Sequence, residues 1–138
     1  MGSKSKKNSK AYYYRGTAYG KLEKYEKALN DLRKAIKLNP KYSKDAEFYY
    51  NLGTSYLHLE KYKQAIENYN ESIKVNPKYT STYKGRAAVY EKTGDYCKAL
   101  EDYEKYLELS GKDDKEIEDK IDELEDKCDE DDDLSGKL

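Results

Sequence analysis

Residues 83–99 read YKGRAAVYEKTGDYCKA and contain a pattern of five residues that occurs three times in the chain. A Tyr is followed by a small residue four positions later, a Tyr three later, a Tyr six later and an Ala three after that. The copies are offset by 37 and then 34 residues, a length typical of solenoids built from stacked helical pairs. The positions are Tyr12, Gly16, Tyr19, Tyr25 and Ala28; Tyr49, Gly53, Tyr56, Tyr62 and Ala65; and Tyr83, Ala87, Tyr90, Tyr96 and Ala99.

The composition fits a folded helical domain in spite of its polarity. Of the 138 residues, 40% are charged, 36% are hydrophobic and 17 are Tyr. The apolar residues recur at helical spacing, so the composition does not indicate disorder. No apolar run approaches the ~20 residues of a membrane span, and no signal peptide is visible. The two cysteines, Cys97 and Cys128, have no metal-site spacing and suggest no disulfide framework, so we expect plain thiols and a cytoplasmic location.

The net charge of −1 hides a strong asymmetry along the chain. The segment charges are +3 over residues 1–8, +6 over 9–42, −1 over 43–113 and −9 over 114–138. Charged runs are usually solvated surface, but ends of opposite sign can also steer partners or promote head-to-tail contacts.

The periodicity predicts two helices in each repeat and a seventh helix after the third repeat. Asn39-Pro40 and Asn76-Pro77 end the first two pairs, because the residue before a proline is disfavoured in the helical conformation. Ser110-Gly111 ends the third pair with a helix C-terminal signal. The expected helices are 9–22, 25–38, 45–59, 62–75, 81–92, 96–109 and 114–128.

The expected seventh helix, 114–128, has one narrow apolar stripe on an otherwise charged surface. A repeat stack needs a terminal element with one apolar and one polar face, so we expect this helix to cap the third repeat. Residues 1–8 and 129–138 are polar and charged, and we expect them to be disordered. The stripe consists of Ile117, Ile121, Leu124 and Cys128.

The repeats resemble the tetratricopeptide repeat (TPR) family, in which an aromatic, Leu-Gly and Tyr in the first helix precede an aromatic, Ala and closing Pro in the second. The resemblance covers 9–113, as repeats 9–42, 46–79 and 80–113. It implies an all-α fold, a right-handed α-solenoid of three helix-turn-helix units with a seventh, capping helix. Arg15 and Arg86 stand where the family usually has Leu, and we expect them to weaken local packing.

No nucleophile motif, phosphate-binding loop or paired His/Cys ligands are visible, so we expect no enzyme, no cofactor and no metal. Most tyrosines fill gaps between helices, so we expect no nucleic-acid partner, and no membrane partner either. The resemblance implies a protein–protein interaction module that holds a peptide or partner segment in the concave groove of the stack. The alternatives are a self-associating scaffold piece, or an accessory TPR domain of a larger enzyme or co-chaperone.

The groove is lined in this family by the first helix of each repeat. Some members clamp the C-terminal carboxylate of heat-shock chaperones, with Lys, Asn and Arg at positions that here are Tyr13, Thr17, Asn51, Ser81 and Gly85. Only Asn51 matches, and without charge-assisted partners the resemblance argues against tails that end in Glu-Glu-Val-Asp. The groove candidates are Tyr13, Thr17, Tyr50, Asn51, Thr54, His58, Lys84 and Ala88.

Overall fold

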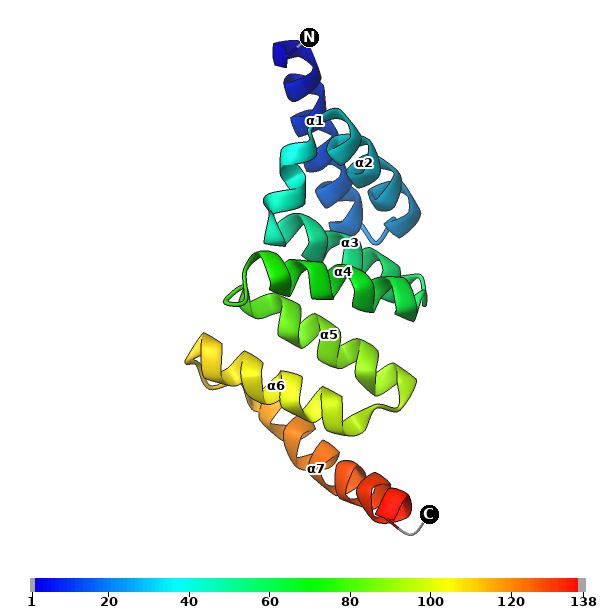
Figure 1. The fold of residues 1–138 in the computed structure, drawn as a ribbon, viewed down its shortest axis with the longest axis vertical. Coiled ribbons are helices and arrows are strands. Elements are labelled where there is room, and N and C mark those ends of the chain that lie inside the picture. The colour runs from blue at the N-terminus through cyan, green and yellow to red at the C-terminus, as the bar shows by residue number, and fades with distance from the viewer. Residues whose placement is uncertain (1, 137–138) are drawn as a thin grey trace. The chain divides into compact units, whose positions relative to one another are not determined.

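The computed structural model describes residues 2–136, which form seven α-helices, one 3-10 helix and no strand. The chain divides after Tyr79 into two compact units, and each is described by itself. In the described part no helix is both long and apolar enough to cross a membrane. The first unit contains α1 (Gly2–Lys21), α2 (Tyr25–Leu38), η1 (Pro40–Lys44), α3 (Ala46–His58) and α4 (Tyr62–Val75); the second contains α5 (Thr80–Thr93), α6 (Tyr96–Ser110) and α7 (Lys115–Gly136) (Figure 1).

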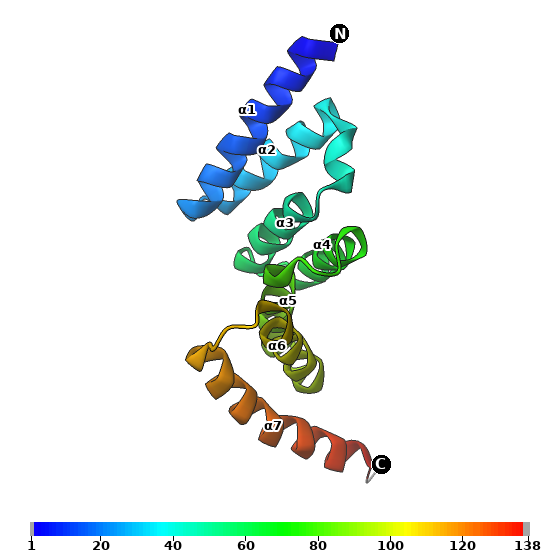
Figure 2. The ribbon, with the colours of Figure 1, turned by 90° about the vertical axis from the view of Figure 1, so that its left-hand side faces the viewer.

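The first unit consists of two helical hairpins, α1 with α2 and α3 with α4, joined by η1 (Figures 1 and 2). Small residues allow the helices of each hairpin to approach closely. A Cβ at Gly16 would lie 3.1 Å from both Asp31 Cβ and Leu32 Cγ, and one at Gly53 would lie 2.6 Å from Tyr69 Cδ1. Two glycines of the repeat pattern are therefore required by the helix crossings.

The helix bounds follow local sequence signals. The ranges of α2 and α4 are the predicted ones, and Asn39 and Asn76 end them in extended conformations before proline. The η1 turn absorbs the three extra residues of the first offset. Asp45 then caps α3, because its Oδ1 accepts the Glu47 amide at 2.9 Å. Gly111 ends α6 in the left-handed region, at φ 61°.

Both outer helices extend beyond the predicted ranges. The prediction of disorder was wrong for residues 2–8 and 129–136, which belong to α1 and α7; residues 1, 137 and 138 lie outside the described part. In α1, Ser9 is buried inside the helix and donates to the Lys6 carbonyl at 2.6 Å. In α7, i,i+4 pairs such as Lys127–Glu123, at 2.9 Å, offset part of the charge repulsion.

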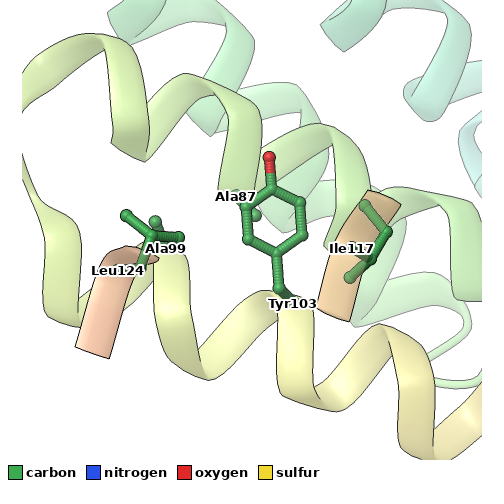
Figure 3. Packing of buried hydrophobic residues seen from close by; sticks show 5 residues of the cluster. All are labelled: Ala87, Ala99, Tyr103, Ile117 and Leu124. Carbon is green, nitrogen blue, oxygen red and sulfur yellow. The ribbon is translucent and has the colours of Figure 1, made fainter. Parts of the chain in front are cut away.

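The second unit is organised around a core in which α7 covers α5 and α6 (Figure 3). Ile117 and Leu124 of α7 lie on either side of Tyr103 of α6, and all three side chains are at most 2% exposed. The predicted cap is confirmed, because Ile117, Ile121 and Leu124 pack in one cluster with Tyr103 and its partly buried neighbours Leu100 and Leu107.

Two arginine–aspartate ion pairs, each with a buried carboxylate, occupy the positions where the family departures occur. Arg15 Nε and Nη2 donate to Asp31 at 2.7 and 2.8 Å, and Arg86 makes the same two bonds to Asp102 at the same distances. Each arginine that replaces a Leu is therefore matched by an aspartate 16 residues later. The second repeat has Leu52 and Asn68 at these positions, and these uncharged side chains cannot form an ion pair.

A disulfide bond joins Cys97 of α6 to Cys128 of α7, so the expectation of free thiols was wrong. The capping helix runs back along α6, and this brings the Cα atoms of the two residues to 4.7 Å. The sequence placed Cys128 on the apolar stripe of the capping helix but did not show that the stripe ends opposite the first turn of α6.

Candidate functional site

The first unit has a pocket of about 270 Å³ between α1 and α3, with two side chains contributed by α2. The helices that line it are α1 and α2 of the first repeat and α3 of the second. Its lining residues are Gly16, Thr17, Gly20, Lys21, Tyr25, Leu32, Tyr50, Asn51, Thr54 and Ser55. Four of the predicted candidates, Thr17, Tyr50, Asn51 and Thr54, are brought together here.

The α1 wall of the pocket is open at Gly20. A Cβ built at this residue would meet no atom within 4 Å, in contrast to Gly16, which is packed against α2. Thr17 has its hydroxyl engaged, because it donates to the Tyr13 carbonyl at 2.9 Å. The wall therefore offers space at Gly20 and the ammonium group of Lys21, which also lines the pocket.

The α3 wall is held in place from behind by Tyr69 of α4. Tyr69 is fully buried, and its hydroxyl shares a hydrogen bond of 2.9 Å with Thr54 Oγ1. Burial raises the pKa of Tyr69, so its hydroxyl remains a neutral hydrogen-bonding group. The Tyr50 ring lies 6.0 Å from the Tyr69 ring and 5.6 Å from the Tyr79 ring. Two packed aromatics thus fix the orientation of Tyr50.

Asn51 provides a polar group without an internal partner. Its Nδ2 atom is buried and makes no hydrogen bond to the described residues. A buried amide N–H that lacks a partner costs about 1–3 kcal/mol, so such groups in native proteins call for an explanation. In this pocket the free donor points to a ligand that carries an acceptor.

The two other candidates of the first two repeats, Tyr13 and His58, do not line the pocket. Tyr13 is stacked on Tyr42, with ring centroids 4.9 Å apart, and its buried hydroxyl also lacks a partner among the described residues. Burial, and next the charge of Asp45, raise its pKa. His58 is stacked on Tyr25 with centroids 4.4 Å apart and planes 5° apart, so it supports a lining residue from the exposed side.

Lys84 and Ala88 belong to α5 in the second unit. Lys84 is exposed, with its Nζ 5.5 Å from the centre of the Tyr106 ring, and Ala88 is half-buried. That Lys84 and Ala88 line a peptide-binding groove stays a prediction. Tyr25, Leu32 and Ser55 also line the pocket and were not predicted. Tyr25 and Leu32 come from α2, and a groove made only of first helices does not include them.

Comparison with known proteins identifies the family. One tetratricopeptide repeat model matches residues 9–42 and 46–79, and a second tetratricopeptide repeat model matches 83–113. Together these matches cover well over half of the chain, so the protein belongs to the tetratricopeptide repeat family. The predicted all-α fold class, TPR units followed by a seventh helix, is confirmed for the described residues. The matched models describe repeats that are generally non-catalytic, and none describes an enzyme.

Solved structures of TPR domains share the fold. The Arabidopsis OM64 TPR domain has a TM-score of 0.77 and 25% identity, over 87% of this chain and 96% of that chain. The first TPR of Spaghetti (RPAP3), bound to the HSP90 peptide SRMEEVD, has a TM-score of 0.77 and 23% identity, over 88% and 93%. The TPR2B domain of yeast Sti1, in complex with pHsp70, has a TM-score of 0.75 and 20% identity, over 86% and 97%. No curated protein matches the sequence.

Proposed function

We propose that this chain is a protein–protein interaction module and that the pocket between α1 and α3 receives part of a peptide or partner segment. The observation that supports the proposal is the Asn51 amide, which is buried and unpartnered in the wall of this pocket. A ligand acceptor at Nδ2 would remove the cost of the missing hydrogen bond. The peptide-bound state of structural neighbours adds support at the level of the family.

The lining residues define the kind of segment that fits. The Asn51 amide and the Lys21 ammonium are donors, so they suit a backbone carbonyl or a carboxylate. Leu32 and the rings of Tyr25 and Tyr50 suit an apolar side chain. The proposed ligand is therefore an extended or helical peptide with an apolar residue beside an acceptor group.

Chaperone tails are not our proposed ligand, although neighbours bind them. At the clamp positions Tyr13 and Thr17, this chain has a ring packed on Tyr42 and a hydroxyl that is already bonded to the backbone. Neither can replace the charged partners of a terminal carboxylate. The peptide SRMEEVD should show no saturable binding at high micromolar concentration; saturable binding that Asn51→Ala abolishes would overturn this exclusion.

The test begins with a peptide selected by display on the folded protein, followed by fluorescence polarisation with the labelled peptide. Asn51→Ala should weaken binding about tenfold, which corresponds to ~1.4 kcal/mol. Gly20→Leu should block the pocket while leaving the fold intact, because its Cβ meets no neighbour and α1 gains helix propensity. The matched control is Asn68→Ala on α4, whose Nδ2 donates to the Gln64 carbonyl at 2.8 Å.

The proposal fails if Gly20→Leu and Asn51→Ala both bind the peptide as tightly as the unmodified protein. The same assay examines the rest of the predicted surface. Tyr50→Ala combined with Lys84→Ala should abolish peptide capture and leave the helical circular dichroism unchanged. If only Tyr50→Ala has an effect, then Lys84 does not contact this ligand.

Self-association is the alternative that the charge distribution favours. Lys4, Lys6 and Lys7 are exposed on the first turns of α1, and the exposed side chains of α7 are mostly acidic. Opposite charges on separate copies attract more strongly at low salt. Sedimentation analysis at low and high ionic strength distinguishes self-association from the proposed peptide-binding module, since a monomer at low salt excludes self-association.

We also propose a cytoplasmic location. In that compartment glutathione and thioredoxin keep thiols reduced. We therefore expect the disulfide between Cys97 and Cys128 to be open in the cell. Rapid alkylation in lysed cells, followed by mass spectrometry, should find both cysteines as thiols. A predominantly oxidised pair would instead indicate an oxidising compartment.

A further inference from the structure

Three metal-ligating side chains meet where the first turn of α6 faces the C-terminal half of α7. The Sγ atoms of Cys97 and Cys128 and a carboxylate oxygen of Asp132 all lie within 4.8 Å of one another. Cys128 and Asp132 are four residues apart on α7, so one face of the helix presents both. Cys97 faces them from the second position of α6. Within the described residues this is the one group of its kind.

We propose that the reduced form of the protein binds a thiophilic divalent ion, Zn²⁺ in the first place, through Cys97, Cys128 and Asp132. Thiolates select zinc over the hard cations magnesium and calcium, and a carboxylate is an accepted third ligand of zinc. Three protein ligands leave the fourth position of a tetrahedron to water. The site therefore differs from the closed four-ligand sites of purely structural zinc.

The helices already hold the ligands close to the required spacing. Two thiolates on a tetrahedral zinc stand about 3.8 Å apart, given Zn–S bonds of about 2.3 Å. In the structure the sulfurs are bonded, and Asp132 Oδ1 lies 4.0 Å from Cys97 Sγ. Once the S–S bond is broken, rotation of the two cysteine side chains about their Cα–Cβ bonds can open the sulfurs to the zinc spacing without moving either helix.

The packing of α7 on α6 does not depend on the disulfide alone. Ile117 and Leu124 are 0% and 2% exposed in the core of the second unit, three turns and one turn before Cys128, respectively. These contacts remain when the disulfide is reduced, so both thiols stay opposite each other. Asp132 follows on the same helix, one turn beyond Cys128.

The local charges favour a cation at this place. Residues 114–138 carry a net charge of −9, which raises the local cation concentration. The nearest lysine on α7 is already engaged, because Lys127 Nζ bonds to Glu123 at 2.9 Å and lies 5.1 Å from the Tyr96 ring centre. The acidic side chains supply attraction, but the two thiolates supply the selectivity.

Metal binding and the disulfide exclude each other. A cellular dithiol of the thioredoxin class, or a phosphine in vitro, supplies the two electrons that open the S–S bond, and two protons complete the thiols. When the ion binds, two metal–sulfur bonds form and the two thiol protons are released. A disulfide or peroxide oxidant takes two electrons back, re-forms the S–S bond and frees the ion. The site would thus hold metal only under reducing conditions.

The test uses the full chain, reduced with a phosphine, freed of reductant without oxygen and titrated with Co²⁺ as a spectroscopic substitute for zinc. We expect thiolate-to-cobalt charge-transfer absorption and intense tetrahedral visible bands that saturate at one ion per chain and disappear when Zn²⁺ is added. Asp132→Asn should weaken Co²⁺ at least about tenfold without preventing disulfide formation. Asp129→Asn, an exposed residue adjacent to Cys128, is the matched control and should bind Co²⁺ normally.

Cys97→Ser should remove the tetrahedral spectrum while circular dichroism shows that the helices are retained. In a second measurement, Zn²⁺ should raise the melting temperature of the reduced protein and leave that of the oxidised protein unchanged. The proposal is overturned if Co²⁺ gives no thiolate band, or if oxidised and reduced protein bind it equally. Equal binding by Asp132→Asn and Asp129→Asn would remove the carboxylate from the site and overturn the three-ligand assignment.

Discussion

Replacing Arg86 by Leu isolates the energy of the buried ion pair in the third repeat. Arg86 holds Asp102 by two bonds of 2.7 and 2.8 Å, and the side chains are 21% and 7% exposed. Hydrogen bonding to Asp102 also raises the pKa of Arg86. Leu at this position leaves the Asp102 carboxylate buried without its cation. Removing one partner of a buried pair costs about 3–5 kcal/mol, and the partial exposure of Arg86 favours the low end of about 3 kcal/mol.

The second repeat provides a natural replacement for the pair. It has Leu52 and Asn68 at the positions of Arg86 and Asp102, 34 residues earlier. The double variant Arg86→Leu with Asp102→Asn reproduces that combination, so its free energy of unfolding should return to within about 1 kcal/mol of the unmodified protein. The difference between the single and double variants measures the coupling within the pair.

Urea unfolding followed by circular dichroism gives the four free energies of the cycle, and hydrogen exchange of the α5 and α6 amides assigns the loss to the third repeat. Arg15→Leu is an internal comparison, because Arg15 is 56% exposed and its loss should cost less. If Arg86→Leu leaves the unfolding midpoint unchanged, the pair does not stabilise this repeat. If the double variant is as unstable as the single one, the loss comes from the arginine's packing and not from the stranded carboxylate.

Three further outcomes follow from the structure. Gly53→Ala should destabilise the first unit by about 1–3 kcal/mol in urea unfolding, because its Cβ would lie 2.6 Å from the buried Tyr69 ring; an unchanged midpoint would contradict this. Opening the disulfide, which spans 31 residues, should lower the stability of the second unit by about 3–4 kcal/mol on loop-closure grounds, measured by thermal unfolding with and without reductant. Burial raises the pKa of Tyr79 from 10.0 to about 12. The unfolded chain therefore loses this proton first, and stability that is complete below pH ~10 should fall towards pH ~12; a flat urea midpoint across that window would refute it.

The helices were predictable because each signal is local. The spacing of Ala28 or Ala65 within its repeat, and the Asn-Pro pairs that follow, fixed the ranges of α2 and α4. The helical start of α1 could not be read in the same way. Residues 2–8 have no apolar stripe that would have predicted the helix, although α1 continues through them.

The candidate site was predictable only where the family register fixes the facing side of a helix. That register brought Thr17, Asn51 and Thr54 into one pocket. Tyr25 and Leu32 were missed, since their contribution depends on how α2 crosses α1 and this crossing is a tertiary property. No pattern in the sequence shows that the Asn51 amide is left without a partner, because satisfaction of a buried group depends on every neighbour around it.

The redox state and the docking of α7 both stabilise the second unit, but the two contributions act on different states of the chain and are therefore separable. The disulfide contributes about 3–4 kcal/mol by restricting the unfolded chain. Burial of Ile117 and Leu124, each worth about 1.5–3 kcal/mol before ordering costs, acts in the folded state whether or not the cysteines are bonded. Opening the S–S bond therefore lowers the stability of the second unit without removing the contacts that hold α7 on α6. A docked α7 with two free thiols and Asp132 beside them is the state that the proposed metal site requires, and the apolar stripe of this helix is what makes that state accessible.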